Sequence, residues 1–170
     1  MKKITILLSL TLLSAMTFAN IKGVNTGIEC NSLAIEPIFK NKAIGIAYAH
    51  YINLKNALVE SDDAIAKTES ANLLTAIKSI EGAENLLIEA KKVAEANSLK
   101  SQRTAFTALS NEMTLLIKKS ELSGGELFLE YCPMANGNEG GYWLSNEKEI
   151  RNPYFGSMML KCGSVKEVIN

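Results

Sequence analysis

Four segments between residues 37 and 122 repeat apolar residues at the three- and four-residue spacing of an amphipathic helix. The first begins at Pro37, since a proline in the first helical turn leaves no hydrogen bond unmade. Short polar or glycine turns separate the expected helices, which cover about residues 37–60, 62–80, 84–96 and 99–122. Because each apolar stripe must be buried against a neighbour, the pattern predicts a mainly α protein built on an antiparallel four-helix bundle.

The pattern changes after the glycines at 124 and 125. Residues 126–132 and 141–145 are short apolar runs typical of β-strands, and a turn-rich loop at 136–141 separates them. We expect a brief helical turn at 146–150. This stretch is too short for a core of its own. Residues 37–170 are therefore predicted to form one domain, in which 123–170 make a small, irregular, Cys- and Met-rich cap with short β-strands.

The N-terminus has the features of an export signal. Lys2 and Lys3 precede an apolar run at 4–13, and small residues follow up to a predicted cleavage between Ala19 and Asn20. The run is too short to span a bilayer. We expect a cleaved signal peptide at 1–19, a polar leader at 20–36, and a mature protein that is periplasmic or secreted, where disulfides persist.

Charge and composition exclude several functions. The 18 basic and 18 acidic residues balance without a basic face, which argues against nucleic acid as a partner. No segment after the signal is apolar enough for membrane insertion of the mature chain. With a single histidine, no Cys-x-x-Cys motif and no phosphate-binding loop, the chain offers no catalytic constellation. We therefore expect no enzymatic activity.

The chemistry that remains is sulfur, concentrated between residues 131 and 163. Cys132 and Met134 share a face if they lie on a strand, and Met158 or Met159 shares a face with Cys162 if that segment is helical. Two thiolates with thioethers suit Cu(I) and other soft metals better than hard cations. If the two arms meet, the expected copper ligands are Cys132, Met134, Met159 and Cys162.

Two further interpretations remain open at this point. His50, the single histidine, lies on the first predicted helix and would add a nitrogen ligand if the cap folds over it. Alternatively, Cys132 and Cys162 form a structural disulfide and the protein is a non-enzymatic interaction module. Its partner surface would then use four aromatic residues of the cap, Tyr142, Trp143, Tyr154 and Phe155. Interconversion of the two sulfur states would make the site redox-gated. The role of Cys30, the third cysteine, stays unassigned.

The cap also resembles a known family. The matching runs are YCPMA at 131–135, YWLS at 142–145, EIRNPYFG at 149–156 and MLKCG at 159–163, with helical matches at 51–62 and 102–110. They are similar to an uncharacterised bacterial exported domain, a domain of unknown function, which also occurs fused to periplasmic adaptor subunits of heavy-metal and copper efflux pumps. The resemblance covers roughly residues 40–168.

This resemblance implies metal handling rather than a defined activity. The Cys-Pro-Met run is similar to short metal-binding segments of those pumps, although Ala135 stands where a histidine often follows. The family pattern matches Met159 rather than Met158 before the final cysteine. The implied role is to buffer a soft ion such as Cu(I), or to deliver it to a metal-efflux or metal-chaperone protein.

Overall fold

The computed structural model describes residues 36–170, which belong to one compact unit. The expected signal peptide, the leader up to residue 35 and Cys30 lie outside the described residues. The described chain is mainly helical, with small antiparallel sheets that involve its C-terminal part. None of its helices combines the length and the apolarity needed to cross a membrane.

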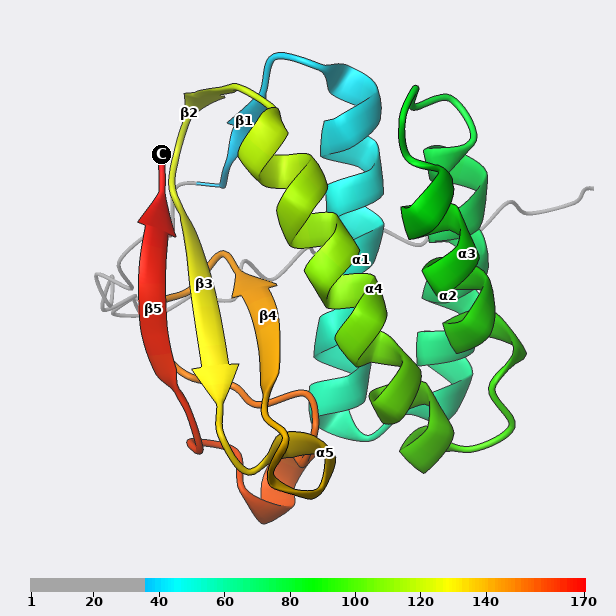
Figure 1. The fold of residues 1–170 in the computed structure, drawn as a ribbon, viewed down its shortest axis with the longest axis vertical. Helices are drawn as coiled ribbons and strands as arrows, with labels where there is room; N and C mark the ends of the chain where they lie inside the picture. Colours follow the sequence, from blue (N-terminus) through cyan, green and yellow to red (C-terminus); the bar gives the residue numbers. More distant parts are fainter. Residues whose placement is uncertain (1–35) are drawn as a thin grey trace, which may run out of the picture. The chain divides into compact units, whose positions relative to one another are not determined.

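Each predicted helical segment contains one long helix. Successive helices pack against each other, α4 also contacts α1, and Figure 1 shows α1 and α4 between the three-stranded sheet and the α2–α3 pair. A short helix, α5, follows the central strand of that sheet. The helices are α1 (Lys42–Glu60), α2 (Asp63–Ile77), α3 (Glu84–Glu95), α4 (Leu99–Lys119) and α5 (Ala135–Asn138).

Side-chain caps fix where the helices begin. The Asp62 carboxylate accepts from the Ile65 N–H, and Ser98 forms a reciprocal capping box with Ser101. The prediction that the first helix begins at Pro37 was wrong, because Asn41 is the N-cap. The residues between them form strand β1 (Ile38–Phe39), which pairs with β2 (Leu122–Gly124) instead of entering the helix.

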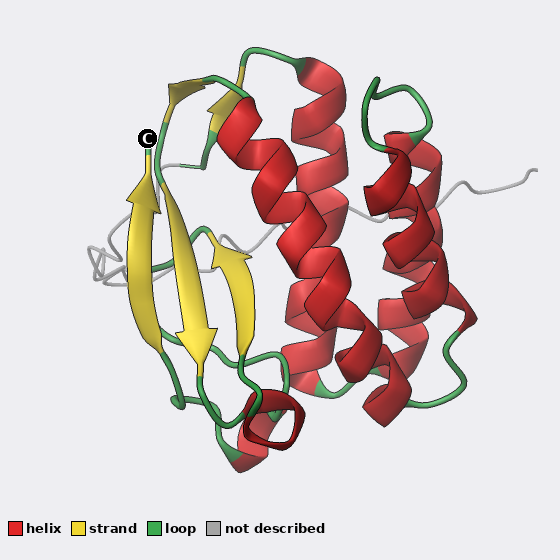
Figure 2. Cartoon of the chain, viewed as in Figure 1, coloured by secondary structure: helices red, strands yellow, loops and turns green. Residues whose placement is uncertain are grey.

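The C-terminal sheet has three antiparallel strands in the order β4-β3-β5 (Figure 2). Strands β3 (Leu127–Cys132) and β4 (Gly141–Ser145) agree with the two predicted strands. Strand β5 (Ser164–Ile169) was not predicted, because its exposed and polar residues give no apolar alternation. The helical turn expected at 146–150 is absent: the chain bends there, and the Ser145 hydroxyl accepts from the Glu147 N–H.

A chain of aromatic rings joins the helices to the sheet. The Tyr51 ring stacks on Phe106, which contacts Tyr154, and the Tyr154 ring meets Trp143 of β4 edge-on. The Tyr51 hydroxyl also accepts from the Leu144 N–H at 3.0 Å. These side chains are buried in a single core shared by both parts of the molecule. Packing of this kind holds the strand ends in a fixed position relative to α1 and α4.

Arg103 of α4 fastens the segment after β4 to the end of α1. Its guanidinium donates to the Pro153 carbonyl at 2.9 Å and to the Leu58 carbonyl at 2.7 Å. Gly156 packs against Arg103 and the end of α1, and its φ is 59°. A Cβ atom at this position would lie 2.6 Å from Arg103 Nη2 and 2.7 Å from the Val59 carbonyl oxygen. Only glycine fits this contact without displacing the backbone of α1.

Candidate functional site

The structure brings the two C-terminal cysteines together. Cys132 is the last residue of β3, Cys162 stands just before β5, and the two strands pair at Tyr131 and Ser164. The two Sγ atoms are 2.7 Å apart, and both cysteines are free thiols. Cys132 is completely buried, whereas Cys162 is partly exposed. The antiparallel ladder therefore positions the pair, and the Cys162 side faces solvent.

The neighbouring thiol changes the acidity of Cys162. Its hydrogen bond with Cys132, together with partial burial, raises the pKa of the Cys162 thiol to about 11. At neutral pH this thiol is protonated, so any reaction of Cys162 as a thiolate requires the proton to leave first. If the pair bound a metal ion, binding would release protons, and the affinity would rise with pH.

The three methionines that lie near the two cysteines in sequence differ in their exposure to solvent. Met159 is half-buried in a turn in which its carbonyl accepts from the Cys162 N–H at 3.0 Å. Met134 follows Cys132 in the turn after β3 and is 44% exposed, and Met158 is 75% exposed. The predicted helical turn before Cys162 is only the 3-10 helix η1 (Gly156–Met158), so Met159 and Cys162 share a tight turn rather than one helix face.

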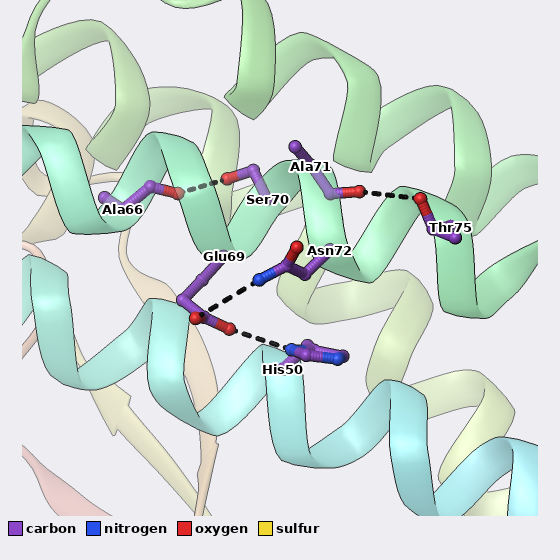
Figure 3. A network of polar contacts seen from close by, with 7 residues as sticks. All are labelled: His50, Ala66, Glu69, Ser70, Ala71, Asn72 and Thr75. Atoms are coloured by element: carbon purple, nitrogen blue, oxygen red, sulfur yellow. Dashed lines mark hydrogen bonds and ion pairs between the residues drawn. The ribbon is translucent and has the colours of Figure 1, made fainter.

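His50 has a partner elsewhere. Its Nδ1 atom lies 2.8 Å from Oε2 of Glu69 on α2, and Asn72 donates to the other oxygen of the same carboxylate at 3.4 Å (Figure 3). The next residue, Tyr51, is the one that reaches the sheet. The structure thus places His50 between α1 and α2 and does not bring it to the cysteines. In residues 36–170, no group of three or more His, Cys, Asp or Glu side chains is arranged to hold a metal.

The prediction that four aromatic residues of the cap form an exposed partner surface was largely wrong. Trp143 and Tyr154 are buried, and Phe155 packs against the core from a half-buried position. Only Tyr142 of the four is exposed, at 39%. The structure uses the other three to join the cap to the helices, because large aromatic side chains gain most from burial.

Sequence analysis missed a buried charged group beside the cysteines. Glu130, two residues before Cys132 on β3, is fully buried, and neither carboxylate oxygen has a hydrogen-bond partner in the described chain. Burial raises the pKa of Glu130 to about 8, opposed by the Lys55 ammonium of α1. The nearby Trp143 indole also favours the carboxylate, although its N–H makes no hydrogen bond of normal geometry.

Lys55 is the counterpart of Glu130. It is almost completely buried, and burial lowers the pKa of its ammonium, while Glu130 opposes that shift. The sequence signal for the pair is the position of Glu130 inside the apolar run LFLEYC of β3.

Comparison with protein families gave one match. Residues 47–125 match the model of a family described as "Protein of unknown function (DUF3347)". This segment carries an uncharacterised domain of unknown function. The DUF3347 segment runs from within α1 to Gly125, directly after β2, so it contains His50, Lys55 and Arg103 but neither cysteine of the pair. Comparisons with curated proteins and with solved structures gave no match.

Proposed function

We propose that this protein binds one soft metal ion, such as Cu(I), through Cys132 and Cys162, with Met159 and Met134 as thioether ligands. The observation that carries the proposal is the meeting of two free thiols, from separate parts of the chain, at the edge of the fold. Sulfur ligands of this kind select Cu(I) over hard cations. The protein would buffer the ion or deliver it, without enzymatic activity of its own.

Metal binding requires a small movement of one thiol. A metal–thiolate bond of about 2.3 Å places two sulfurs that share an ion roughly 4 Å apart, whereas Sγ of Cys132 and Sγ of Cys162 are 2.7 Å apart. Cys132 is buried on a strand, but Cys162 is partly exposed and precedes β5. We expect Cys162 to move outward, toward solvent, when the ion enters.

The two methionines would contribute differently. Met159 shares a hydrogen-bonded turn with Cys162, so the movement of one carries the other. Met134 is exposed immediately after Cys132 and Pro133, where it would meet an incoming ion first. We therefore expect the loss of Met159 to weaken binding, and the loss of Met134 to slow uptake more than it lowers affinity.

The cellular setting is part of the proposal. The export-like N-terminus and the family resemblance support a periplasmic or secreted protein whose partner is a metal-efflux or metal-chaperone protein. We propose that the four long helices form an antiparallel bundle that serves as the scaffold. The sulfur ligands would lie on the attached cap, outside the DUF3347 segment.

Cu(I) titration of the reduced full chain tests this function. In competition with bicinchoninate under anaerobic conditions, the wild type should bind one Cu(I) per chain, and Cys132→Ser and Cys162→Ser should each abolish binding. Cys30→Ser is the matched control and should bind normally. Wild-type protein that takes up no copper, or cysteine variants that bind as tightly as wild type, would contradict the proposal.

The short sulfur–sulfur distance specifically favours a second function, a structural disulfide. Oxidation would join the two Sγ atoms, release two protons and pass two electrons to a thiol oxidant of the exported compartment. The bond would close the loop between β3 and β5 and stabilise the fold by about 3–4 kcal/mol. Mass spectrometry of untreated protein decides between the two: a mass two hydrogens below the reduced value supports the disulfide.

A further inference from the structure

A second site lies where the N-terminal half of α4 passes the turn between β3 and β4. A pocket of about 450 Å³ opens there, and α5 lies at the same end of the sheet (Figure 1). Its volume is within the range of small-molecule sites. Thr107 and Asn111 line it from α4, while Tyr131, Asn136 and Tyr142 line it from the sheet end. Neither cysteine lines this pocket, so the site is independent of the proposed metal function.

Two tyrosines form an aromatic wall. Tyr131 of β3 and Tyr142 of β4 are paired across the strands, with ring centroids 4.5 Å apart and planes tilted by 40°. Gly140 holds this wall in place: its φ is 88°, and a Cβ atom there would lie 2.2 Å from the Tyr131 hydroxyl oxygen. A larger residue would push the ring away. The wall is thus preorganised by the turn that carries it.

The polar groups around the wall are also held in position. Asn136 Nδ2 donates to Thr107 Oγ1 at 2.8 Å and to the Gly140 carbonyl at 3.0 Å, which leaves the Asn136 side-chain oxygen available as an acceptor. The hydroxyls of Tyr131 and Tyr142 and the Asn111 amide make no hydrogen bond with the described part of the chain. The pocket therefore offers several neutral groups to which a ligand could bond in place of water.

The chemistry of these groups limits the ligand. Tyrosine hydroxyls and asparagine amides both donate and accept hydrogen bonds, as sugar hydroxyls do. Glu139 is the one charged residue that lines the pocket, so an anion such as phosphate would meet a negative charge there. An organic cation would find the Tyr131 ring already carrying the Lys166 ammonium, 5.5 Å from its centroid.

We propose that this pocket binds a neutral saccharide of one or two residues, with its ring against Tyr142 and its hydroxyls bonded to Asn111 and Asn136. The aromatic wall supplies apolar contact for the C–H face of the sugar, and the amides fix its orientation. Such a division between one apolar wall and a few placed polar groups is typical of small-ligand sites.

The test is an NMR titration of the full-length, isotope-labelled protein with glucose, maltose and N-acetylglucosamine. At least one sugar should give saturable amide shifts centred on Tyr131, Gly140 and Tyr142. Tyr142→Ala should weaken binding by about 3- to 10-fold. Asn111→Ala should weaken it by about 5-fold. Tyr142→Phe keeps the ring and should lose less affinity than Tyr142→Ala, and Thr75→Ala on α2 is the neutral control.

The proposal fails if no sugar produces saturable shifts at these residues up to about 100 mM. It also fails if choline or inorganic phosphate shifts them instead, or if Tyr142→Ala binds sugar as well as wild type. The dispersed spectrum of each variant shows that it is folded, so loss of binding is separated from loss of structure.

Discussion

The helical region, residues 42–119, and the C-terminal region, residues 123–170, solve the burial of polar groups differently. Several buried polar side chains of the helices are hydrogen-bonded: Gln102 donates to the Asp63 carbonyl and Ser70 to the Ala66 carbonyl. In the C-terminal region, Glu130 is buried without a partner, and two thiols face each other. Such groups destabilise a fold and concentrate at functional sites.

Backbone conformation shows the same contrast. In the helical region, positive φ values occur only at the turn residues Ser61 and Gly82 of the described chain. In the C-terminal region seven residues have them, among them Asn136, Gly140 and Gly156. The helices therefore act as a regular scaffold, and the unusual chemistry and geometry are kept in the smaller region beside them.

The largest expected effect on stability comes from a residue that contacts both regions and tests whether they unfold separately. Phe106 is completely buried and its ring contacts Tyr51 of α1 and Tyr154 of the C-terminal region. Phe106→Ala should lower the free energy of unfolding by about 3–5 kcal/mol. Urea unfolding followed by helical circular dichroism and by Trp143 fluorescence should show one shared transition.

Leu115→Ala is the matched control, since Leu115 lies on the same helix and is half exposed. It should change stability little. Separate transitions of the two signals in the wild type would mean that the helices and the sheet unfold independently, contrary to the shared core.

The second prediction concerns the pH dependence of stability that the buried Glu130 of the C-terminal region causes. The pKa of Glu130 rises from 4.5 to about 8 on folding, because burial outweighs the Lys55 ammonium while Glu147 adds to the rise. Between these values the folded protein holds a proton that the unfolded chain has lost, so stability is highest below pH 4.5 and falls as pH rises through 8. This contribution is roughly 2–4 kcal/mol.

Glu130→Gln should remove that dependence, because the amide never ionises. Thermal or urea unfolding between pH 4.5 and pH 9 should give a flatter profile and a variant more stable than wild type at pH 9. Glu81→Gln, at an exposed position, should keep the wild-type profile. A wild-type profile that rises across this interval would contradict a buried, protonated Glu130.

A smaller effect comes from the contact between the two regions. Arg103→Met would remove the guanidinium that donates to the Pro153 and Leu58 carbonyls and should lower stability by about 1.5–3 kcal/mol. Arg103→Lys keeps the charge but loses the forked geometry, so its stability should lie between that of wild type and that of Arg103→Met. Hydrogen exchange should show faster opening of residues 151–156 in both variants, and unchanged exchange there would refute the fastening role.

The smallest effect lies wholly within the helices. Ser98 closes the N-terminus of α4 in a capping box, so Ser98→Ala should lower stability by about 1 kcal/mol. Ser98→Asp should restore most of the loss, because aspartate also caps. The copper and sugar titrations should be the same in both variants as in wild type, and altered binding would show that α4 is not an independent scaffold.

The sequence predicted the helices well because their stripes and caps are local signals. The spacing of apolar residues in 42–119 and the polar turns between the helices are visible without any knowledge of tertiary contacts. Strand β5 and the β1–β2 pair were not predicted, because their pairing joins residues far apart in sequence and their side chains are mostly exposed. Only the folded chain shows that Pro37 precedes a strand.

For the site, spacing located the sulfur residues but not their surroundings. The two arms were expected to meet, and the structure places Cys132 beside Cys162. The pairing of His50 with Glu69 and the burial of Glu130 depend on which faces α1, α2 and β3 present to each other. Residue type alone carries no such information, and whether the pair holds a metal stays a prediction.

The tight fit at Gly156 has a consequence for variation in this protein. Residues other than glycine rarely adopt the left-handed backbone that this position requires. A Cβ atom would also clash with α1 and Arg103, so even alanine would have to push them away. A saturation library selected only for folding should return a single amino acid at this position, while neighbouring Ser157 and Met158 accept many. Glycine at 156 would then serve as a marker for whether a distant homologue still docks its cap in the same way.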